Sequence, residues 1–424
     1  MQVGTKKAIR IIVFGLGVLG VIASAGVLLS GQSNSASSRL PRKSNPAGWR
    51  TGQIVIKPQF DSSSRFKGGL ALVHIRGKYG YIDKTGRYII NPQFDDAGDF
   101  EDGLARVRMG DYRTGKYGFI DKTGRYVINP RFDDAKDFED GLAAVGIGDK
   151  WGYINKTGRY VINPQFDKVS GYKQIGYADN EFGGFKEGLS LVEIGEKWGF
   201  IDKTGKIVIN PQFTFASVFK EGLALVEIGG KYGFIDKTGR YVINPRFDNA
   251  WDFEDGLARV EIGGNWGNGK WGYIDKTGKI VINPRFDDAW DFEDGLALVK
   301  IGGKSGYIDK TGQFVINPRF DAAWDFEDGL AVVRIGDEKT GEWGYIDKTG
   351  QFVINPQFSD ARDFEDGLAA VLIGNEETGA WGYIDKTGQF VINPQFSSVS
   401  NFADGLAQVF IGDRKTGKWG YIAR

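Results

Sequence analysis

Apolar and polar side chains alternate along a short stretch that recurs throughout the chain. In residues 151–155 (Trp-Gly-Tyr-Ile-Asn) the two aromatic side chains point to one face and the Gly and Ile to the other, which is the period of a β-strand. Residues 160–163 (Tyr-Val-Ile-Asn) are apolar on both faces. Residues 155–158, which read Asp-Lys-Thr-Gly in most other copies, have the composition of a type I turn closed by a glycine with positive φ. The stretch predicts a β-hairpin, followed by a proline that ends the ladder or lies at a sheet edge.

This hairpin is part of a longer repeat. Its proline occurs ten times, from Pro58 to Pro394, at spacings of 34, 38, 34, 47, 34, 39, 34, 38 and 38 residues. A Gly-Leu pair has the same period, and a third strand such as residues 105–109 follows it, with small or apolar residues alternating with charged ones. The sequence therefore predicts an all-β tandem array of ten antiparallel β-meander repeats of about 34 residues, with three strands each.

The phase of the repeat at the two ends of the array predicts a closed ring. Arg424 lies 30 residues after Pro394, and Thr51 lies seven residues before Pro58, so residues 51–424 hold a whole number of units cut inside one hairpin turn. The first strand can then pair with the last and leave no exposed edge. We favour a closed, β-propeller-like ring. An open β-solenoid is the alternative, because ten units exceed the usual four to eight blades and 34 residues are few for four strands.

The N-terminal part of the chain differs from the repeats. Lys6, Lys7 and Arg10 precede an uncharged apolar run over residues 11–29, which as one helix would be about 28 Å long. Residues 1–30 are therefore expected to be a signal anchor in the cytoplasmic membrane, with the repeats outside. Cleavage near Ala25 would instead make them a signal peptide and the protein secreted. Residues 31–50 are rich in Ser, Asn and Pro and predict a flexible linker.

Residues 150–158 (Lys-Trp-Gly-Tyr-Ile-Asn-Lys-Thr-Gly), followed by Val-Ile-Asn-Pro-x-Phe-Asp, resemble the repeat of bacterial WG-repeat (KWG repeat) proteins. The resemblance covers residues 51–424. It implies β-rich tandem repeats in bacterial proteins that are often found at the surface or envelope, with no general activity attached. Tyrosine replaces the tryptophan in several units, and Ser305 replaces it in one.

Composition excludes several function classes. The chain has 54 basic and 54 acidic side chains, which gives no footprint for nucleic acid. It has no cysteine and one histidine, so Ser-His-Asp and Cys-His catalysis and thiolate or multi-histidine metal sites are not expected. The acidic segment of each unit, for example residues 286–295, could bind Ca²⁺. We favour a solvated turn in which Asp side chains cap backbone amides, and we predict neither a metal nor a cofactor.

The candidate binding residues are aromatic. Trp251, Trp290 and Trp324 occupy the position before Asp-Phe in three successive units, where other units hold Gly98, Lys136 or Arg362, so the repeat does not require an aromatic there. They predict either a stripe that stacks on sugars or anchors a protein, or side chains that fill gaps between units. The insertion over residues 169–184 adds two further candidates, Tyr172 and Tyr177.

Together these features predict a non-catalytic, exported and membrane-tethered scaffold that binds protein or cell-envelope polysaccharide. No catalytic residue is assigned. The alternative is a glycan-active hydrolase that uses the carboxylates of one repeat. Its paired carboxylates, however, occur in most units, which favours a structural role for them.

Overall fold

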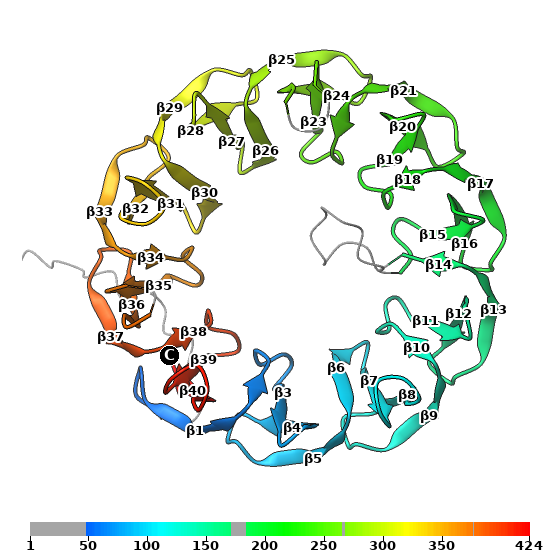
Figure 1. Cartoon of the computed structure of the whole chain (residues 1–424), viewed down its shortest axis with the longest axis horizontal. Coiled ribbons are helices and arrows are strands. Elements are labelled where there is room, and N and C mark those ends of the chain that lie inside the picture. Colours follow the sequence, from blue (N-terminus) through cyan, green and yellow to red (C-terminus); the bar gives the residue numbers. More distant parts are fainter. Residues whose placement is uncertain (1–47, 171–183, 265–267, 376) are drawn as a thin grey trace, which may run out of the picture. The chain divides into compact units, whose positions relative to one another are not determined.

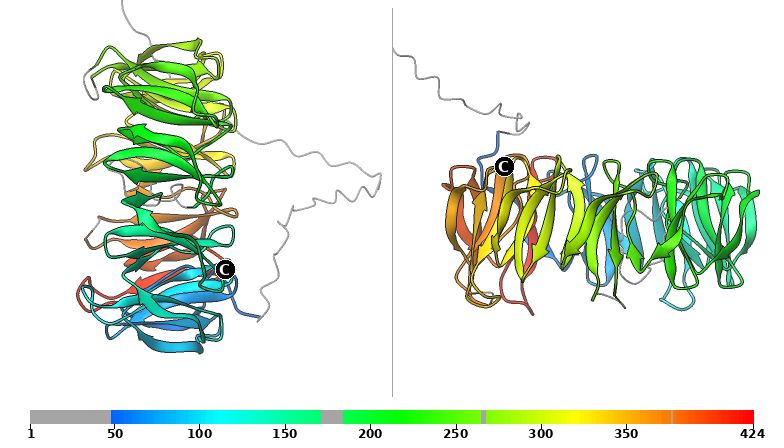
Figure 2. Two further views of the ribbon diagram at one scale, coloured as in Figure 1. Left: turned by 90° about the vertical axis from the view of Figure 1, so that its right-hand side faces the viewer. Right: turned by 90° about the horizontal axis from the view of Figure 1, so that it is seen from above.

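The computed structural model describes residues 48–170, 184–264, 268–375 and 377–424. All described residues belong to one compact unit of the chain, Asn45–Arg424. This unit consists of ten four-stranded antiparallel sheets. The sheets stand side by side in a ring around a central opening (Figure 1), and the ring is flat when seen from the side (Figure 2).

We number the sheets as blades 1 to 10, from β2–β5 in blade 1 to β38, β39, β40 and β1 in blade 10. The innermost strands are β2 (Ser62–Ser63), β6 (Asp96–Glu101), β10 (Asp134–Ala135), β14 (Lys168–Val169), β18 (Phe215–Ala216), β22 (Asn249–Ala250), β26 (Asp288–Glu293), β30 (Ala322–Glu327), β34 (Asp360–Ala361) and β38 (Ser398–Val399). The second strands are β3 (Leu70–Ile75), β7 (Leu104–Met109), β11 (Leu142–Ile147), β15 (Leu189–Ile194), β19 (Leu223–Ile228), β23 (Leu257–Ile262), β27 (Leu296–Ile301), β31 (Leu330–Ile335), β35 (Leu368–Ile373) and β39 (Leu406–Ile411).

The third strands begin the predicted hairpin. They are β4 (Lys78–Asp83), β8 (Lys116–Ile120), β12 (Lys150–Asn155), β16 (Lys197–Asp202), β20 (Lys231–Asp236), β24 (Lys270–Asp275), β28 (Lys304–Asp309), β32 (Glu342–Ile346), β36 (Ala380–Asp385) and β40 (Lys418–Ala423). The outermost strands are β5 (Tyr88–Phe94), β9 (Tyr126–Phe132), β13 (Tyr160–Phe166), β17 (Ile207–Phe213), β21 (Tyr241–Phe247), β25 (Ile280–Phe286), β29 (Phe314–Phe320), β33 (Phe352–Phe358), β37 (Phe390–Phe396) and β1 (Ile54–Phe60).

The Asp-Lys-Thr-Gly turn joins the third strand to the outermost one, as the sequence predicts. In blade 1 the Asp83 carboxylate accepts hydrogen bonds from the amide of Thr85 at 2.9 Å, its hydroxyl at 2.6 Å and the amide of Arg87 at 3.1 Å. Gly86 has a φ of 82° and donates its amide hydrogen to the Asp83 carbonyl at 2.9 Å. Each residue type of the turn therefore has a defined structural role.

The glycine of each Trp-Gly pair is explained by a bulge in the outermost strand. Tyr79 lies opposite Phe94 and Tyr81 opposite Ile90, so several residues around Pro92 face the single residue Gly80. A Cβ at Gly80 would lie 2.6 Å from the Ile90 carbonyl oxygen and 2.6 Å from the Pro92 nitrogen. Pro92 lies in β5, at the outer edge of its sheet, as expected of a residue that cannot donate to a central ladder.

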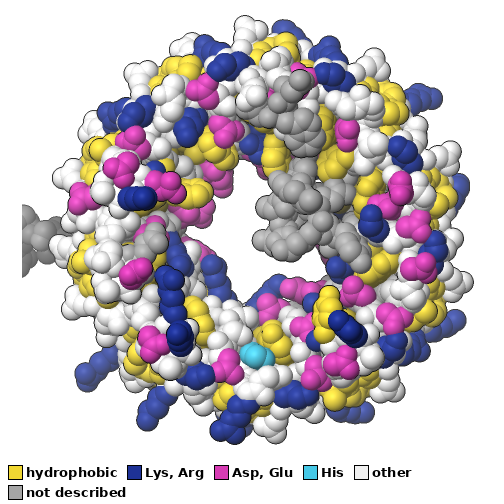
Figure 3. Space-filling model, in the orientation of Figure 1, with side chains coloured by type: hydrophobic (Ala, Val, Ile, Leu, Met, Phe, Trp, Pro, Cys, Tyr) yellow, Lys and Arg dark blue, Asp and Glu magenta, His cyan; other side chains and the backbone are white. Residues whose placement is uncertain are grey.

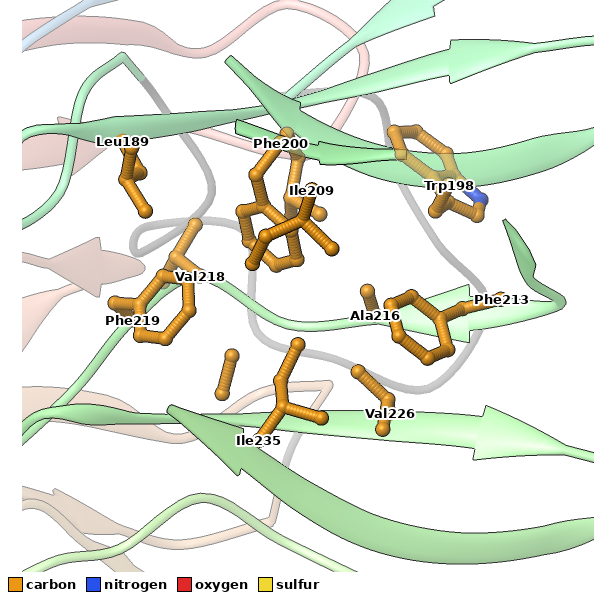
Figure 4. Close-up of a cluster of buried hydrophobic side chains, with 12 residues drawn as sticks. Leu189, Trp198, Phe200, Ile209, Phe213, Ala216, Val218, Phe219, Val226 and Ile235 are labelled. Carbon is orange, nitrogen blue, oxygen red and sulfur yellow. The ribbon is translucent and has the colours of Figure 1, made fainter. Parts of the chain in front are cut away.

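The hydrophobic core is divided among the spaces between neighbouring sheets. Between blades 4 and 5 the buried cluster contains Trp198, Phe200 and Ile209 of one sheet and Ala216, Phe219 and Ile235 of the next (Figure 4). The Trp of Trp-Gly is buried in this way, as predicted. Because each sheet has a neighbour on both sides, the ring leaves no apolar sheet face uncovered.

The ring closes through the predicted pairing of the first strand with the last. β1 pairs antiparallel with β40, with Ile54 opposite Ile422 and Phe60 opposite Trp419. The Gly52 amide donates to the Ala423 carbonyl at 2.8 Å, and the Ala423 amide donates to the Gln53 carbonyl at 2.9 Å. These are the hydrogen bonds that close the equivalent turn within each other blade. The closed ring is thus confirmed over the open solenoid.

The prediction of three strands per unit is wrong, because each blade has a fourth, innermost strand. In most blades this strand has only two residues, such as Ser62–Ser63, which is too short for an alternation to be recognised in the sequence. The predicted N-terminal helix and linker lie largely outside the described residues. No helix that could cross a membrane is present in the part of the chain that the structure describes.

Candidate ligand-binding site

Many carboxylates of the acidic segments link neighbouring blades. The Asp95 carboxylate accepts from Lys78 Nζ at 2.6 Å, the lysine before the aromatic-Gly pair of blade 1, and from the Gly110 amide of blade 2 at 2.9 Å. These two hydrogen bonds lower the pKa of Asp95 below its ordinary value. The equivalent pairs are Lys116–Asp133, Lys150–Asp167, Lys231–Asp248, Lys270–Asp287, Lys304–Asp321 and Lys418–Asp61. The first Asp of the segment is therefore a structural residue.

A second set of carboxylates joins the blades on the side of the hairpin turns. Asp102 of blade 2 has a φ of 53°, and its carboxylate accepts from the Gly141 amide of blade 3 at 2.8 Å. Its carbonyl accepts from Nζ of Lys156, the turn lysine of blade 3, at 2.6 Å. The predicted capping of backbone amides is observed here. Within the described ranges, no group of three or more Asp, Glu or His side chains is arranged to hold a metal ion.

The variable position before Asp-Phe lies on the inner wall of the ring, on a fixed backbone. A buried tyrosine of the third strand donates its hydroxyl hydrogen to the carbonyl of this residue, from Tyr273 to Trp290 at 2.6 Å and from Tyr307 to Trp324 at 2.6 Å. Tyr345 makes the same bond to Arg362 at 2.8 Å. The backbone is therefore held in the same way whichever side chain is present, so this position can vary without altering the blade.

The three candidate tryptophans have different surroundings. Trp251 packs against the cluster between blades 6 and 7, and the Arg259 guanidinium carbon lies 4.2 Å from its ring centroid. Trp290 is half-buried and packs against the cluster between blades 7 and 8. Trp324 is 56% exposed. The structure thus places all three on successive blades, with Trp324 the most accessible. Tyr172 and Tyr177, the other two candidates, lie outside the described residues.

A pocket of about 300 Å³ opens beside Trp290 on the inner wall. Its other lining residues are Glu254, Asp291, Phe292, Glu293 and Asp325. They come from blades 6, 7 and 8, so the pocket bridges neighbouring blades. Acidic side chains gather along the inner rim beside β26 and β30 (Figure 3). The pocket therefore combines aromatic walls with several carboxylates.

The carboxylates of this sector raise one another's pKa values. Burial, together with the charges of Glu293, Asp291 and Asp363, raises the pKa of Asp325 to about 6. Burial and neighbouring carboxylates, Glu327 first among them, also raise the pKa values of Glu293 and Asp363. One carboxylate oxygen of Asp363 is buried and accepts no hydrogen bond from the described residues. Among the described residues, the Arg259 guanidinium lowers the pKa of Asp325, but burial and the neighbouring carboxylates have the larger effect.

Sequence reasoning did not single out Glu293, Asp325 or Asp363, because the same Asp-Phe-Glu pattern recurs in most units. A signal was present at the equivalent positions of other units. Arg65, Gly184, Val218 and Asn401 replace the Asp there, and Lys67, Lys186, Lys220 and Ala403 replace the Glu. Aligning the units by position would have shown that units 6 to 9 all have Asp and Glu at these two positions. No unit in this run has a basic residue there.

The closed ring of four-stranded antiparallel sheets, with an inner strand facing a central opening, defines a β-propeller-like protein with ten blades. Its inner wall carries a pocket in one sector. The chain belongs to the WG containing repeat family, whose profile matches residues 50–79, 79–112, 117–151, 151–184, 198–232, 232–266, 271–304, 306–338, 343–376 and 381–419.

Solved structures with some similarity include a eukaryotic initiation factor, with 14% identity and a TM-score of 0.44 over 71% of this chain and 88% of that one. The tricorn protease has 12% identity and a TM-score of 0.21 over 87% of this chain and 43% of its own. Hsv2 of Kluyveromyces lactis has 8% identity and a TM-score of 0.31 over 67% and 94%. A comparison with curated proteins found no significant match.

Proposed function

We propose that this protein is a non-catalytic binding scaffold whose recognition surface is the inner wall of blades 6 to 9. The observation that carries the proposal is the exposed Trp324, which directly precedes the pocket residue Asp325 on a backbone fixed by the repeat. An exposed indole beside a concave, partly apolar pocket is typical of surfaces that anchor a protein partner or stack on a sugar. Both a protein and a cell-envelope glycan are therefore candidate ligands.

Tryptophan fluorescence of the full-length protein in mild detergent tests this proposal. Envelope glycan fragments and peptides would be titrated into the wild type and into Trp324→Ala. We expect the variant to weaken binding while changing the free energy of unfolding by less than about 0.5 kcal/mol, because the side chain is largely exposed. Tyr112→Ala is the matched control, since Tyr112 is an 88% exposed aromatic in the turn between β7 and β8. Equal binding by Trp324→Ala and the wild type would contradict the proposed surface.

We further propose that the repeats are exported and held at the cytoplasmic membrane by residues 11–29. Lys6, Lys7 and Arg10 before an apolar run support an orientation with the N-terminus inside. A reporter fused after Arg424 should be active only outside the cytoplasm, and activity only inside would refute this orientation. Release of the repeats after cleavage near Ala25 would give a secreted protein instead.

A glycan-active hydrolase is the second candidate function. It is favoured by Asp325, a carboxyl group with a pKa of about 6 beside Glu293, because a glycosidase needs one protonated and one ionised carboxyl group. Release of reducing ends from envelope polysaccharide that is lost in Asp325→Asn and in Glu293→Gln would support hydrolysis. Binding without turnover would support the scaffold.

A further inference from the structure

Four carboxylates on the inner wall of blades 7 to 9 have no ion pair among the residues that the structure describes. They are Glu293, Asp325, Glu327 and Asp363. None of the four makes an ion pair or a hydrogen bond with another residue that the structure describes. The pocket reaches two of them, Glu293 and Asp325, and contains no lysine or arginine in its lining.

Several carboxylates at equivalent positions have basic partners. Within blades 7 and 9 themselves, Asp291 pairs with Arg259 Nε at 3.1 Å, and Glu365 lies 3.6 Å from Arg65. In other blades, Glu254 pairs with Lys220, and Glu139 pairs with Lys186 at 2.5 Å. Glu293, Asp325, Glu327 and Asp363 therefore differ from these neighbours and equivalents in having no ion pair among the described residues.

Two tryptophans belong to the same stretch of the inner wall as these carboxylates. Trp290 lines the pocket, and Trp324 directly precedes Asp325 on β30. The carbonyls of both tryptophans are held by tyrosine hydroxyl groups, so the backbone that carries the rings is fixed before a ligand arrives. An aromatic face beside carboxylates attracts an ammonium or guanidinium group through both cation–π and ion-pair interactions.

We propose that this sector binds a basic polypeptide segment, with a lysine or arginine side chain seated between Trp290, Glu293 and Asp325. This inference rests on the proposed binding function and assigns its ligand class. Negative charge on three successive blades matches an extended segment with several cationic side chains better than a single point charge. It disfavours nucleic acid and acidic polysaccharide, which the same carboxylates would repel.

The test uses the full-length protein and four soluble probes: a ten-residue oligolysine, spermine, a neutral oligosaccharide and oligoglutamate. Titration is followed by tryptophan fluorescence and calorimetry. Oligolysine should bind, oligoglutamate should not, and affinity should fall as salt is raised because screening weakens charge pairs. Spermine should bind more weakly than oligolysine, because it cannot reach carboxylates on three blades at once. Spermine binding more tightly than the peptide would replace the polypeptide with a small amine as the ligand.

Three variants place the binding in the pocket. Asp325→Asn, Glu293→Gln and Trp324→Ala should each weaken oligolysine binding about fivefold or more. Glu338→Gln is the matched control, since Glu338 is an exposed carboxylate of the same blade outside the inner wall. Thermal unfolding of every variant checks that the ring is intact.

The outcomes separate the two proposals. Oligolysine binding that none of the three variants weakens would overturn the inference, because it would be non-specific attraction. Binding of the neutral oligosaccharide alone, reduced in Trp324→Ala, would overturn the cationic ligand but leave the scaffold function standing. If none of the four probes binds, and Trp324→Ala binds envelope fragments as the wild type does, both the scaffold function and the cationic ligand are refuted.

Discussion

Replacing Asp325 by Asn should stabilise the ring at pH 8 and should not do so at pH 4. The pKa of this carboxyl group is raised from an ordinary value of 3.8 to about 6, by burial first and then by Glu293, Asp291 and Asp363. An acid with a raised folded-state pKa favours the protonated folded protein. Its contribution to the free energy of unfolding therefore falls as pH rises from about 4 to about 6 and stays low above that. Asn has the same shape and no charge.

The magnitude follows from the shift. A difference of roughly two pKa units corresponds to about 3 kcal/mol at high pH, since one unit is about 1.4 kcal/mol. The neighbouring carboxylates share this repulsion, so the observed gain should be between about 1 and 3 kcal/mol. Denaturant unfolding of the full-length protein at pH 4 and pH 8, followed by circular dichroism, measures it.

Asp137→Asn is the matched control, because Asp137 occupies the same position in blade 3 but lies 3.3 Å from Arg106 Nε. Removing this partner should destabilise the ring at pH 8 by about 1 kcal/mol. A loss of stability in Asp325→Asn at pH 8, or an equal gain at both pH values, would refute the assignment of an uncompensated, buried charge.

Three further predictions concern the ring itself. A circular permutant that joins Arg424 to Thr51 and opens the chain between Lys237 and Thr238 should fold with an unchanged melting temperature, and an unfolded permutant would contradict closure. Deleting one whole repeat should unfold the ring. Gly80→Ala should destabilise by about 3 kcal/mol in denaturant unfolding, because the added Cβ would meet the Ile90 carbonyl oxygen and the Pro92 nitrogen at 2.6 Å. Gly68→Asp should be more stable than Gly68→Ala by about 0.5 kcal/mol. Both variants bear the strain of the left-handed conformation at this position, and only Asp can pair with Lys122, whose Nζ would lie 3.6 Å from the added Cβ. Equal stability of the two variants, or the same difference when Lys122 is replaced by Ala, would argue against the restored pair.

The features that could be predicted from the sequence are those that depend on residues within one repeat and on the repeat period. The turn chemistry of residues 83–86, the edge position of Pro92 and the pairing of Ile54 with the last strand all follow from residue types and the period. The innermost strand was missed because two residues such as Asp134 and Ala135 carry no detectable alternation.

The acidic sector was missed for a different reason. Whether a carboxylate is neutralised depends on a residue one repeat away, as with Lys220 and Glu254, or with Glu139 and Lys186, which the insertion separates further in sequence. Within one unit the Glu residues of the pattern look equivalent. Glu254 differs from Glu293 in its neighbour: the preceding unit has Lys220 at the equivalent position in one case and Glu254 in the other.

The arrangement of charge along the wall implies that ligand binding and stability are coupled. Glu293 and Glu327 lie on adjacent blades at the position that holds Lys186 and Lys220 in blades 4 and 5, so like charges face each other where opposite charges pair elsewhere. A bound cation would remove this repulsion in addition to making its own contacts, and should raise the melting temperature most above pH 6. Asp325→Asn removes part of the same repulsion. The stabilisation by oligolysine and the stabilisation by Asp325→Asn should therefore be less than additive, because both act on one set of carboxylates.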